Sequence, residues 1–260
     1  MFSLESKTAV VLGGTAGLGL TVARSYVDAG AKVVIGGRRS DGDDIANTFG
    51  AEFVRVDVGS EDSVRRAMDS VLSRFGEIDI LVNNAGIWPY ARIEDVSVET
   101  AQQIVNVNFL GVVWGIKYGS RIMKNGGSII NTTALVTYRP HQNLGVYAAS
   151  KAALINLNKT AAIELGDRGI NVNSVNPTSV VGTEGNKDMP QEEVNLITNL
   201  TPLRRLGKPE DYIGIFNLLA SDAGQYINAV DVPVDGGLLA GVSNLSMEIL
   251  GKTTAIPVDG

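Results

Sequence analysis

The chain has 260 residues and a net charge of −6, and its 44% hydrophobic and 19% charged residues are typical of a globular protein with a sizeable core. The acidity and the lack of a basic stripe argue against a nucleic-acid partner. With no cysteine and one histidine, His141, disulfides, thiolate catalysis and structural zinc are excluded, and a Ser-His-Asp triad is disfavoured.

The first residues predict a cytoplasmic protein. Residues 1–7 lack the basic stretch followed by an apolar stretch that is typical of a signal peptide. No apolar run approaches the roughly 20 residues that a membrane helix needs. We therefore expect no membrane partner.

Apolar runs alternate with helical patterns from residue 8 onward. Strands are expected at Thr8–Leu12, Lys32–Ile35, Phe53–Val56, Ile78–Val82, Gly127–Asn131, Ile170–Val175 and Val230–Val234. Helices are expected at about Thr15–Ala29, Asp62–Phe75, Glu99–Met123 and Gly145–Leu165. Continuous apolar strands that alternate with helices predict an α/β fold, with a Rossmann-type doubly wound parallel sheet of about seven strands and helices on both faces. One dinucleotide-binding domain would then span residues 1–260.

Residues 178–207 interrupt the alternation. They are polar and lie between prolines, with one helical stretch near Gln191–Asn199. A long insert of this kind is often a lid over a site. We therefore expect a substrate lid here.

The first strand runs into the segment Gly13-Gly14-Thr15-Ala16-Gly17-Leu18-Gly19. Small residues let the backbone turn tightly and approach a pyrophosphate, and the N-terminus of the following helix favours an anion. A glycine run alone is an ordinary strand-to-helix turn. Its position after the first strand of a βαβ unit predicts nucleotide binding.

The second strand ends in Gly36-Gly37-Arg38-Arg39. An acidic residue at this place commonly holds the ribose hydroxyls of NAD, whereas arginine suits the 2′-phosphate of NADP. We therefore favour NADP(H) as the cofactor through Arg38, with NAD(H) as the alternative. Both arginines could instead be solvated loop residues, and this interpretation is strongest for Arg39.

Tyr147 and Lys151 are the most specific pair in the chain. Positions i and i+4 share one face of a helix, so the phenol and the ammonium can point into one cleft. The nearby positive charge would lower the tyrosine pKa from its ordinary value of about 10 towards the range useful for acid–base work. The alternative is a half-buried helix with an exposed lysine.

Taken in order, these motifs resemble the short-chain dehydrogenase/reductase family over about residues 3–237. The family's Gly-x-x-x-Gly-x-Gly corresponds to Gly13, Gly17 and Gly19, with Leu12 where a threonine is usual. Further signatures match at Asn83-Asn84-Ala85-Gly86 and Asp235-Gly236-Gly237. The resemblance implies cofactor contacts from Gly13, Thr15, Gly17, Leu18, Gly19, Arg38, Asp57, Val58, Asn84, Ala85, Gly86, Tyr147, Lys151, Pro177 and Val180.

The family's chemistry is hydride transfer between a nicotinamide and a secondary alcohol or ketone. The resemblance implies that Tyr147 moves a proton at the substrate oxygen and that Lys151 holds the nicotinamide ribose and tunes Tyr147. Asn108 would help to hold a water linked to the lysine. The two longest helices resemble those through which the family forms dimers and tetramers, so a homo-tetramer or a dimer is expected.

One position departs from the family. Its catalytic serine lies 13 residues before the tyrosine, and that position is Ala134 here. Three explanations stay open: an engineered replacement of serine, a transfer of the role to Thr133, and a natural variant with weak or altered activity. We favour the first, because the other motifs are intact. The alternative function is a catalytically impaired nucleotide-binding regulatory or scaffold protein.

Several side chains near the signatures are candidates for a substrate pocket. Their mostly apolar character favours a largely apolar or cyclic alcohol or ketone. Ordinary packing is an equal alternative for each of them taken singly. The candidates are Trp88, Tyr90, Thr133, Ala134, His141, Leu144 and Met189.

Overall fold

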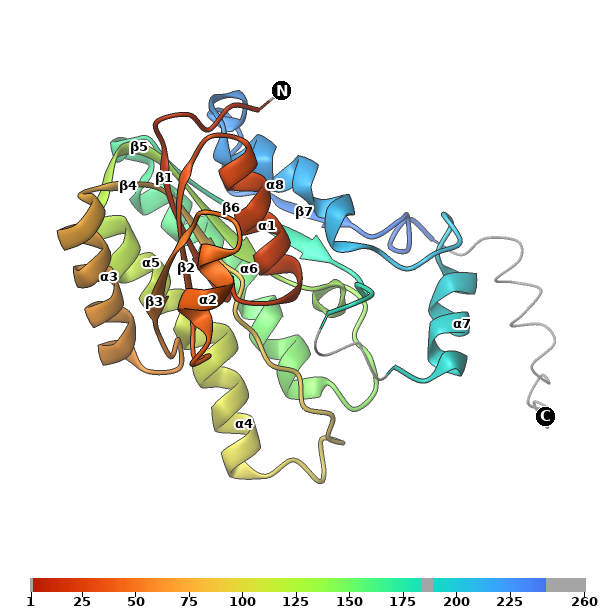
Figure 1. Ribbon diagram of the computed structural model, residues 1–260. Helices are drawn as coiled ribbons and strands as arrows, with labels where there is room; N and C mark the ends of the chain where they lie inside the picture. Colours follow the sequence, from red (N-terminus) through yellow and green to blue (C-terminus); the bar gives the residue numbers. More distant parts are fainter. Residues whose placement is uncertain (1, 184–188, 242–260) are drawn as a thin grey trace, which may run out of the picture.

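A computed structural model describes residues 2–183 and 189–241 of the chain. Its strands form one seven-stranded sheet with the order β3-β2-β1-β4-β5-β6-β7 (Figure 1). Every pairing is parallel. The strands are β1 Thr8–Leu12, β2 Lys32–Gly37, β3 Glu52–Arg55, β4 Ile78–Asn83, β5 Met123–Thr132, β6 Ile170–Pro177 and β7 Asp231–Val234.

Helices cover both faces of the sheet (Figure 1). They are α1 Gly17–Asp28, α2 Gly42–Asn47, α3 Glu61–Phe75, α4 Val98–Val105, α5 Gly111–Arg121, α6 Gly145–Glu164, α7 Gln191–Leu200 and α8 Ile213–Ala220. The helices α3, α5 and α6 pack on one face, and α1 and α8 pack on the other. The predicted doubly wound α/β fold is confirmed.

The side chains of β1 explain why its sequence is apolar throughout. Val10 and Leu12 belong to the core beneath α3 and α5, whereas Ala9 and Val11 belong to the core beneath α1 and α8. All residues of the strand are buried. A strand buried on both faces cannot alternate apolar with polar residues.

Some predicted boundaries were wrong. The expected helix Glu99–Met123 is divided into α4, a π-helical turn at Asn106–Leu110 and α5, and Met123 begins β5 instead. The first helix begins at Gly17, because Ala16 is extended and Gly17 has a positive φ of 52°. The helices α2 and α8 were not predicted. The first is very short, and the second is apolar along most of its length, so neither gives a clear amphipathic period.

The expected lid segment contains α7, close to the predicted helix. Its two ends are joined, because Val181 N donates to Gly207 O at 2.9 Å and Gly207 N donates to Ser179 O at 3.2 Å. Residues 184–188 of this segment lie outside the described residues. In the part of the chain that the structure describes, no helix is both long and apolar enough to span a membrane.

Candidate active site

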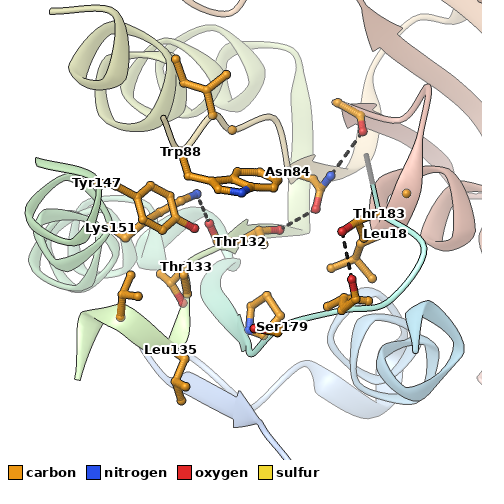
Figure 2. A pocket seen from close by; sticks show the side chains of 18 of the residues that line it. Leu18, Asn84, Trp88, Thr132, Thr133, Leu135, Tyr147, Lys151, Ser179 and Thr183 are labelled. Carbon is orange, nitrogen blue, oxygen red and sulfur yellow. Dashed lines mark hydrogen bonds between the residues drawn. The ribbon is translucent and has the colours of Figure 1, made fainter. Parts of the chain in front are cut away.

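A cavity of about 850 Å³ opens along the carboxyl ends of the central strands. It extends from the glycine-rich turn after β1 to the inner face of α7, and Figure 2 shows many of its side chains. All of the candidate residues predicted from the sequence border it except Gly19 and Asn108, which lie behind its wall. The sequence motifs therefore meet in one space, although they are far apart in the chain.

The turn after β1 has room only for glycine at key positions. Gly13 has a φ of +82°, and a Cβ built on it would lie 2.5 Å from Ala85 N. A Cβ on Gly19 would lie 2.2 Å from Gly13 O. The bare backbone therefore packs tightly and leaves the start of α1 open to the cavity. This cradle fits the pyrophosphate of a dinucleotide.

Asn84 fixes the strand ends beside this cradle. Its Nδ2 donates to Gly13 O at 3.2 Å, and its Oδ1 accepts from Thr132 Oγ1 at 3.1 Å. Its backbone N donates to Leu12 O at 2.9 Å. One side chain thus links the ends of β1, β4 and β5, and Figure 2 shows both of its side-chain hydrogen bonds.

The two arginines after β2 have different surroundings. Arg39 forms a bidentate ion pair with Asp41, with Nε–Oδ1 and Nη2–Oδ2 distances of 2.8 and 2.7 Å. Arg38 borders the main cavity and also a smaller hollow with Arg55 and Arg66. The main cavity and the adjoining hollow are thus rich in guanidinium groups where they meet at Arg38. A phosphate group would be stabilised there.

Lys151 is buried without a carboxylate partner among the described residues. It is 3% exposed, and its Nζ donates to Thr132 O at 2.7 Å. Burial lowers its pKa to about 8. The ammonium therefore stands at the junction of α6 and the end of β5, with donor capacity left for a ligand.

Tyr147 lies one helical turn before Lys151 on α6, and both side chains border the cavity. Its ring centroid is 6.3 Å from that of Trp88, and Figure 2 shows the three side chains together. Burial raises the pKa of Tyr147, and the nearby Tyr90 adds to this effect. The expected lowering of the tyrosine pKa is therefore wrong for the chain alone, because burial of the phenol raises the pKa instead.

Asn108 occupies the π-helical turn between α4 and α5. It is completely buried, its Nδ2 donates to Ile87 O at 2.7 Å, and its Oδ1 accepts from Ile87 N at 2.8 Å. A Cβ on Gly86 would lie 3.4 Å from Asn108 Oδ1 and 3.6 Å from Lys151 Nζ. The amide and the ammonium thus converge above Gly86. A π-turn inside a helix often marks a functional position.

The end of β5 places Ala134 at the cavity and directs the hydroxyl of its neighbour away. Ala134 is 7% exposed and borders the cavity. Thr133 Oγ1 lies 2.7 Å from Asp231 Oδ1 and 3.1 Å from Val175 O, both acceptors. A hydroxyl has one proton, so the hydroxyl of Thr133 has none to offer a ligand.

Sequence reasoning missed most of the far wall of the cavity. One face of α7 lines it, and so does the turn after β7. The i, i+3, i+4, i+7 spacing of residues on one face of α7 is the sequence signal that could have identified this wall. The missed residues include Leu135, Val136, Arg139, Pro140, Ser179, Thr183, Glu193, Leu196, Ile197, Leu200 and Leu238.

Comparison with known proteins agrees with this geometry. A family model described as enoyl-(acyl carrier protein) reductase matches residues 13–239. The NADP-dependent (R)-specific alcohol dehydrogenase of Lentilactobacillus kefiri is 36% identical over 252 residues, which cover 91% of this chain and 98% of that protein. The 2,5-dichloro-2,5-cyclohexadiene-1,4-diol dehydrogenase of Sphingobium indicum is 35% identical, with 92% and 98% covered.

A solved structure is also similar. The gluconate 5-dehydrogenase of Burkholderia cenocepacia, in complex with NADP and tartrate, superposes with a TM-score of 0.89 and 31% identity. The match covers 93% of this chain and 98% of that one. The chain belongs to the short-chain dehydrogenase/reductase family of oxidoreductases.

Proposed function

We propose that the chain is a nicotinamide-dependent dehydrogenase that interconverts a secondary alcohol and a ketone. The observation that carries this proposal is the position of Tyr147 and Lys151, which border one continuous cavity with the glycine-rich cradle of Gly13 and Gly17. An acid–base group and a dinucleotide cradle in one cavity are what hydride transfer requires.

We propose NADP(H) as the preferred cofactor and NAD(H) as the alternative. Arg38 supports this choice, because it borders the cavity directly after β2, where we expect the adenosine ribose to bind, and no acidic residue follows β2 directly. NADP is also named for the alcohol dehydrogenase and the gluconate 5-dehydrogenase that resemble this chain. The residues proposed to hold the cofactor are Gly13, Thr15, Gly17, Leu18, Gly19, Arg38, Asp57, Val58, Asn84, Ala85, Gly86, Tyr147, Lys151, Pro177 and Val180.

In the proposed mechanism, residues of this chain move the proton, and the cofactor supplies or accepts the hydride. The nicotinamide, when bound, supplies or accepts the hydride at the substrate carbon. Because burial keeps Tyr147 protonated at neutral pH, its hydroxyl can donate a proton to a carbonyl oxygen during reduction. The Lys151 ammonium favours the resulting phenolate by opposite charge. In oxidation the phenolate takes the proton back from the alcohol.

We propose that Asn108 acts indirectly, by holding the backbone of the segment that follows β4. Its hydrogen bonds to Ile87 fix the segment after β4, which carries Gly86 and Trp88 into the cavity. A water held beside its Oδ1 and Lys151 Nζ would connect the ammonium to a proton path, as the family resemblance implies. Asn108 is therefore proposed as a positioning residue.

Ala134 leaves the substrate oxygen without the hydroxyl that relatives of this kind use. The hydroxyl of Thr133 is a poor substitute, because Asp231 and Val175 already accept its proton. Two explanations for Ala134 therefore remain: an engineered replacement of serine and a natural variant of low activity. Removing one donor to a reacting oxygen typically costs about 10²–10³ in rate, so this chain would be slow but not inert.

The substrate end is proposed to take a largely apolar or cyclic alcohol or ketone. Residues 178–207 are proposed as its lid within the single domain 1–260, with α7 contributing the inner wall. The proposed substrate contacts are Trp88, Tyr90, Thr133, Ala134, His141, Leu144 and Met189. We also propose that the protein forms a homo-tetramer or a dimer and that it is cytoplasmic.

The test measures reduction of neutral cyclic ketones with NADPH and NADH, in this chain and in Ala134→Ser. We expect slow turnover in this chain and a rise of about 10²-fold in the variant, with NADPH preferred. Thr133→Val is the matched control, and it should leave the gain in Ala134→Ser intact. Binding of NADPH without turnover in either protein would instead favour the regulatory or scaffold function.

A further inference from the structure

A single arginine stands at the substrate end of the cavity. Arg139 follows the short 3-10 turn Leu135–Thr137, and its backbone N donates to Leu135 O at 3.0 Å. Its side chain is exposed and borders the cavity. The position of Arg139 is therefore fixed by the turn that begins directly after Ala134.

Little in the described part of the chain engages the guanidinium of Arg139. Among the residues that the structure describes, its side chain makes one hydrogen bond, from Nη1 to Leu238 O at the long distance of 3.5 Å. A guanidinium has five N–H donors in a planar fork. Arg39 and Arg205 each form a bidentate pair with an aspartate instead. Arg139 thus keeps its fork available at the mouth of a ligand cavity.

Most of the side chains that line this end of the cavity are apolar. The segment after β7 is held by Asp235, whose carboxylate accepts from the backbone N of Gly237 and of Leu239 at 2.9 and 2.7 Å. This turn keeps Leu238 buried against the cavity. The other apolar neighbours at this end of the cavity are Leu135, Val136, Leu144, Leu196, Ile197 and Leu200.

Among the described residues that line this end of the cavity, Glu193 on α7 is the acidic one. Burial raises the pKa of the Tyr90 phenol, and the nearby charge of Glu193 adds to this effect. No ion pair joins Glu193 to Arg139 within residues 2–183 and 189–241, so neither charge is neutralised by direct contact with the other. The described lining of the substrate end therefore carries one positive and one negative side chain. A singly charged anion fits this balance better than a dianion such as a phosphate ester.

We infer that Arg139 binds a carboxylate of the substrate, so that the substrate class is a carboxylic acid with a secondary alcohol or ketone on an apolar frame. This inference rests on the proposed dehydrogenase function and narrows it. The carboxylate accepts two N–H bonds from the fork of Arg139, and the apolar frame packs on α7 and Leu238. The reacting oxygen then points to Tyr147 at the other end of the molecule.

The experiment measures ligand binding, so that it does not depend on turnover. The protein–NADP⁺ complex is titrated calorimetrically with 4-oxocyclohexanecarboxylate and with its methyl ester, which differ only in the charged group. We expect the carboxylate to bind about tenfold more tightly than the ester. In Arg139→Leu the two affinities should become equal, and in Arg139→Lys a preference of a few-fold should remain, because a point charge replaces the fork.

Two variants control for charge and for folding. Arg65→Leu removes an exposed arginine on α3, away from the cavity, and should leave the tenfold preference unchanged. Glu193→Gln should keep the preference for the carboxylate. Equal binding of acid and ester by the parent protein, absence of binding by both, or a preference that survives in Arg139→Leu would overturn the inference. Reduction of neutral ketones would still support the dehydrogenase in each case.

Discussion

The two ends of the cavity are built in different ways. At the cofactor end, backbone packs on backbone, and glycines such as Gly13 and Gly19 are the only residues that fit. At the substrate end, single side chains on α7 and on the loop after β5 form the wall. The first end is therefore fixed by a short continuous motif. The second depends on residues that come together only in the folded chain.

This difference indicates which residues can be exchanged without disturbing the fold. A glycine in a tight backbone contact tolerates no side chain, so the cofactor end would keep its shape among proteins that use the same dinucleotide. A wall of exposed and half-buried side chains can exchange them without disturbing the sheet. Substrate choice is expected to vary at α7 and Arg139, while the chemistry stays at Tyr147 and Lys151.

The largest effect is expected at Tyr147, which lies between the cofactor end and the substrate end of the cavity. Tyr147→Phe removes the proton donor but keeps the ring beside Trp88. General acid–base catalysis contributes about 10²–10⁴-fold, so kcat for ketone reduction in the Ala134→Ser background should fall by about 10³-fold. The affinity for NADPH, measured by fluorescence titration, should change little. An equal loss in both quantities would mean that Tyr147 acts in binding and not in proton transfer.

The next effect tests whether close backbone packing at the cofactor end excludes a side chain. Gly19→Ala places a Cβ 2.2 Å from Gly13 O, and the backbone must shift. Overpacking of this kind costs about 1–3 kcal/mol, so the Kd for NADPH should rise about tenfold or more. Gly214→Ala is the matched control on α8, where a Cβ meets nothing within 4 Å. Its NADPH affinity should be unchanged and its stability slightly higher.

The sequence predicted the cofactor end more completely than the substrate end, where the candidate residues border the cavity but Arg139, Leu238 and the inner face of α7 were missed. Gly13, Asn84 and Tyr147 lie in local motifs at the ends of strands or in a helix, so spacing identifies them. Leu238 and Arg139 meet through a contact between residues 99 positions apart. The π-turn at Asn108 was also missed, because one extra residue in a helical turn barely changes the apolar period.

Burial of Lys151 predicts a pH-dependent stability. Its pKa is about 8 in the folded protein against the ordinary value of 10.5, so the unfolded chain binds more protons between these pH values. The stability of the cofactor-free protein should therefore rise with pH across this window. Lys151→Met should be more stable than the parent by about 3 kcal/mol at pH 7, and this difference should disappear near pH 10.5. Chemical denaturation at several pH values measures it, and a constant difference would contradict the account.

A smaller effect is expected at the adenosine end. Arg38→Leu should weaken NADPH binding about tenfold and leave NADH binding unchanged, because only NADPH has the 2′-phosphate. Arg39→Leu is the comparison, since Arg39 forms a bidentate pair with Asp41. Its effect on NADPH affinity should be clearly smaller. Tighter binding of NADH than of NADPH by the parent protein would overturn the assignment to Arg38.

We propose that hydride passes directly between the cofactor and the substrate beside Tyr147, where the two parts of the cavity adjoin. The most direct measurement follows deuterium from NADPH that carries deuterium at both C4 positions to the carbonyl carbon of a cyclic ketone by mass spectrometry. We predict deuterium on the alcohol carbon at a low rate in this chain, at a much higher rate in Ala134→Ser, and almost none in Tyr147→Phe with Ala134→Ser. Equal transfer with and without the Tyr147 hydroxyl, or no transfer in Ala134→Ser, would contradict the claim.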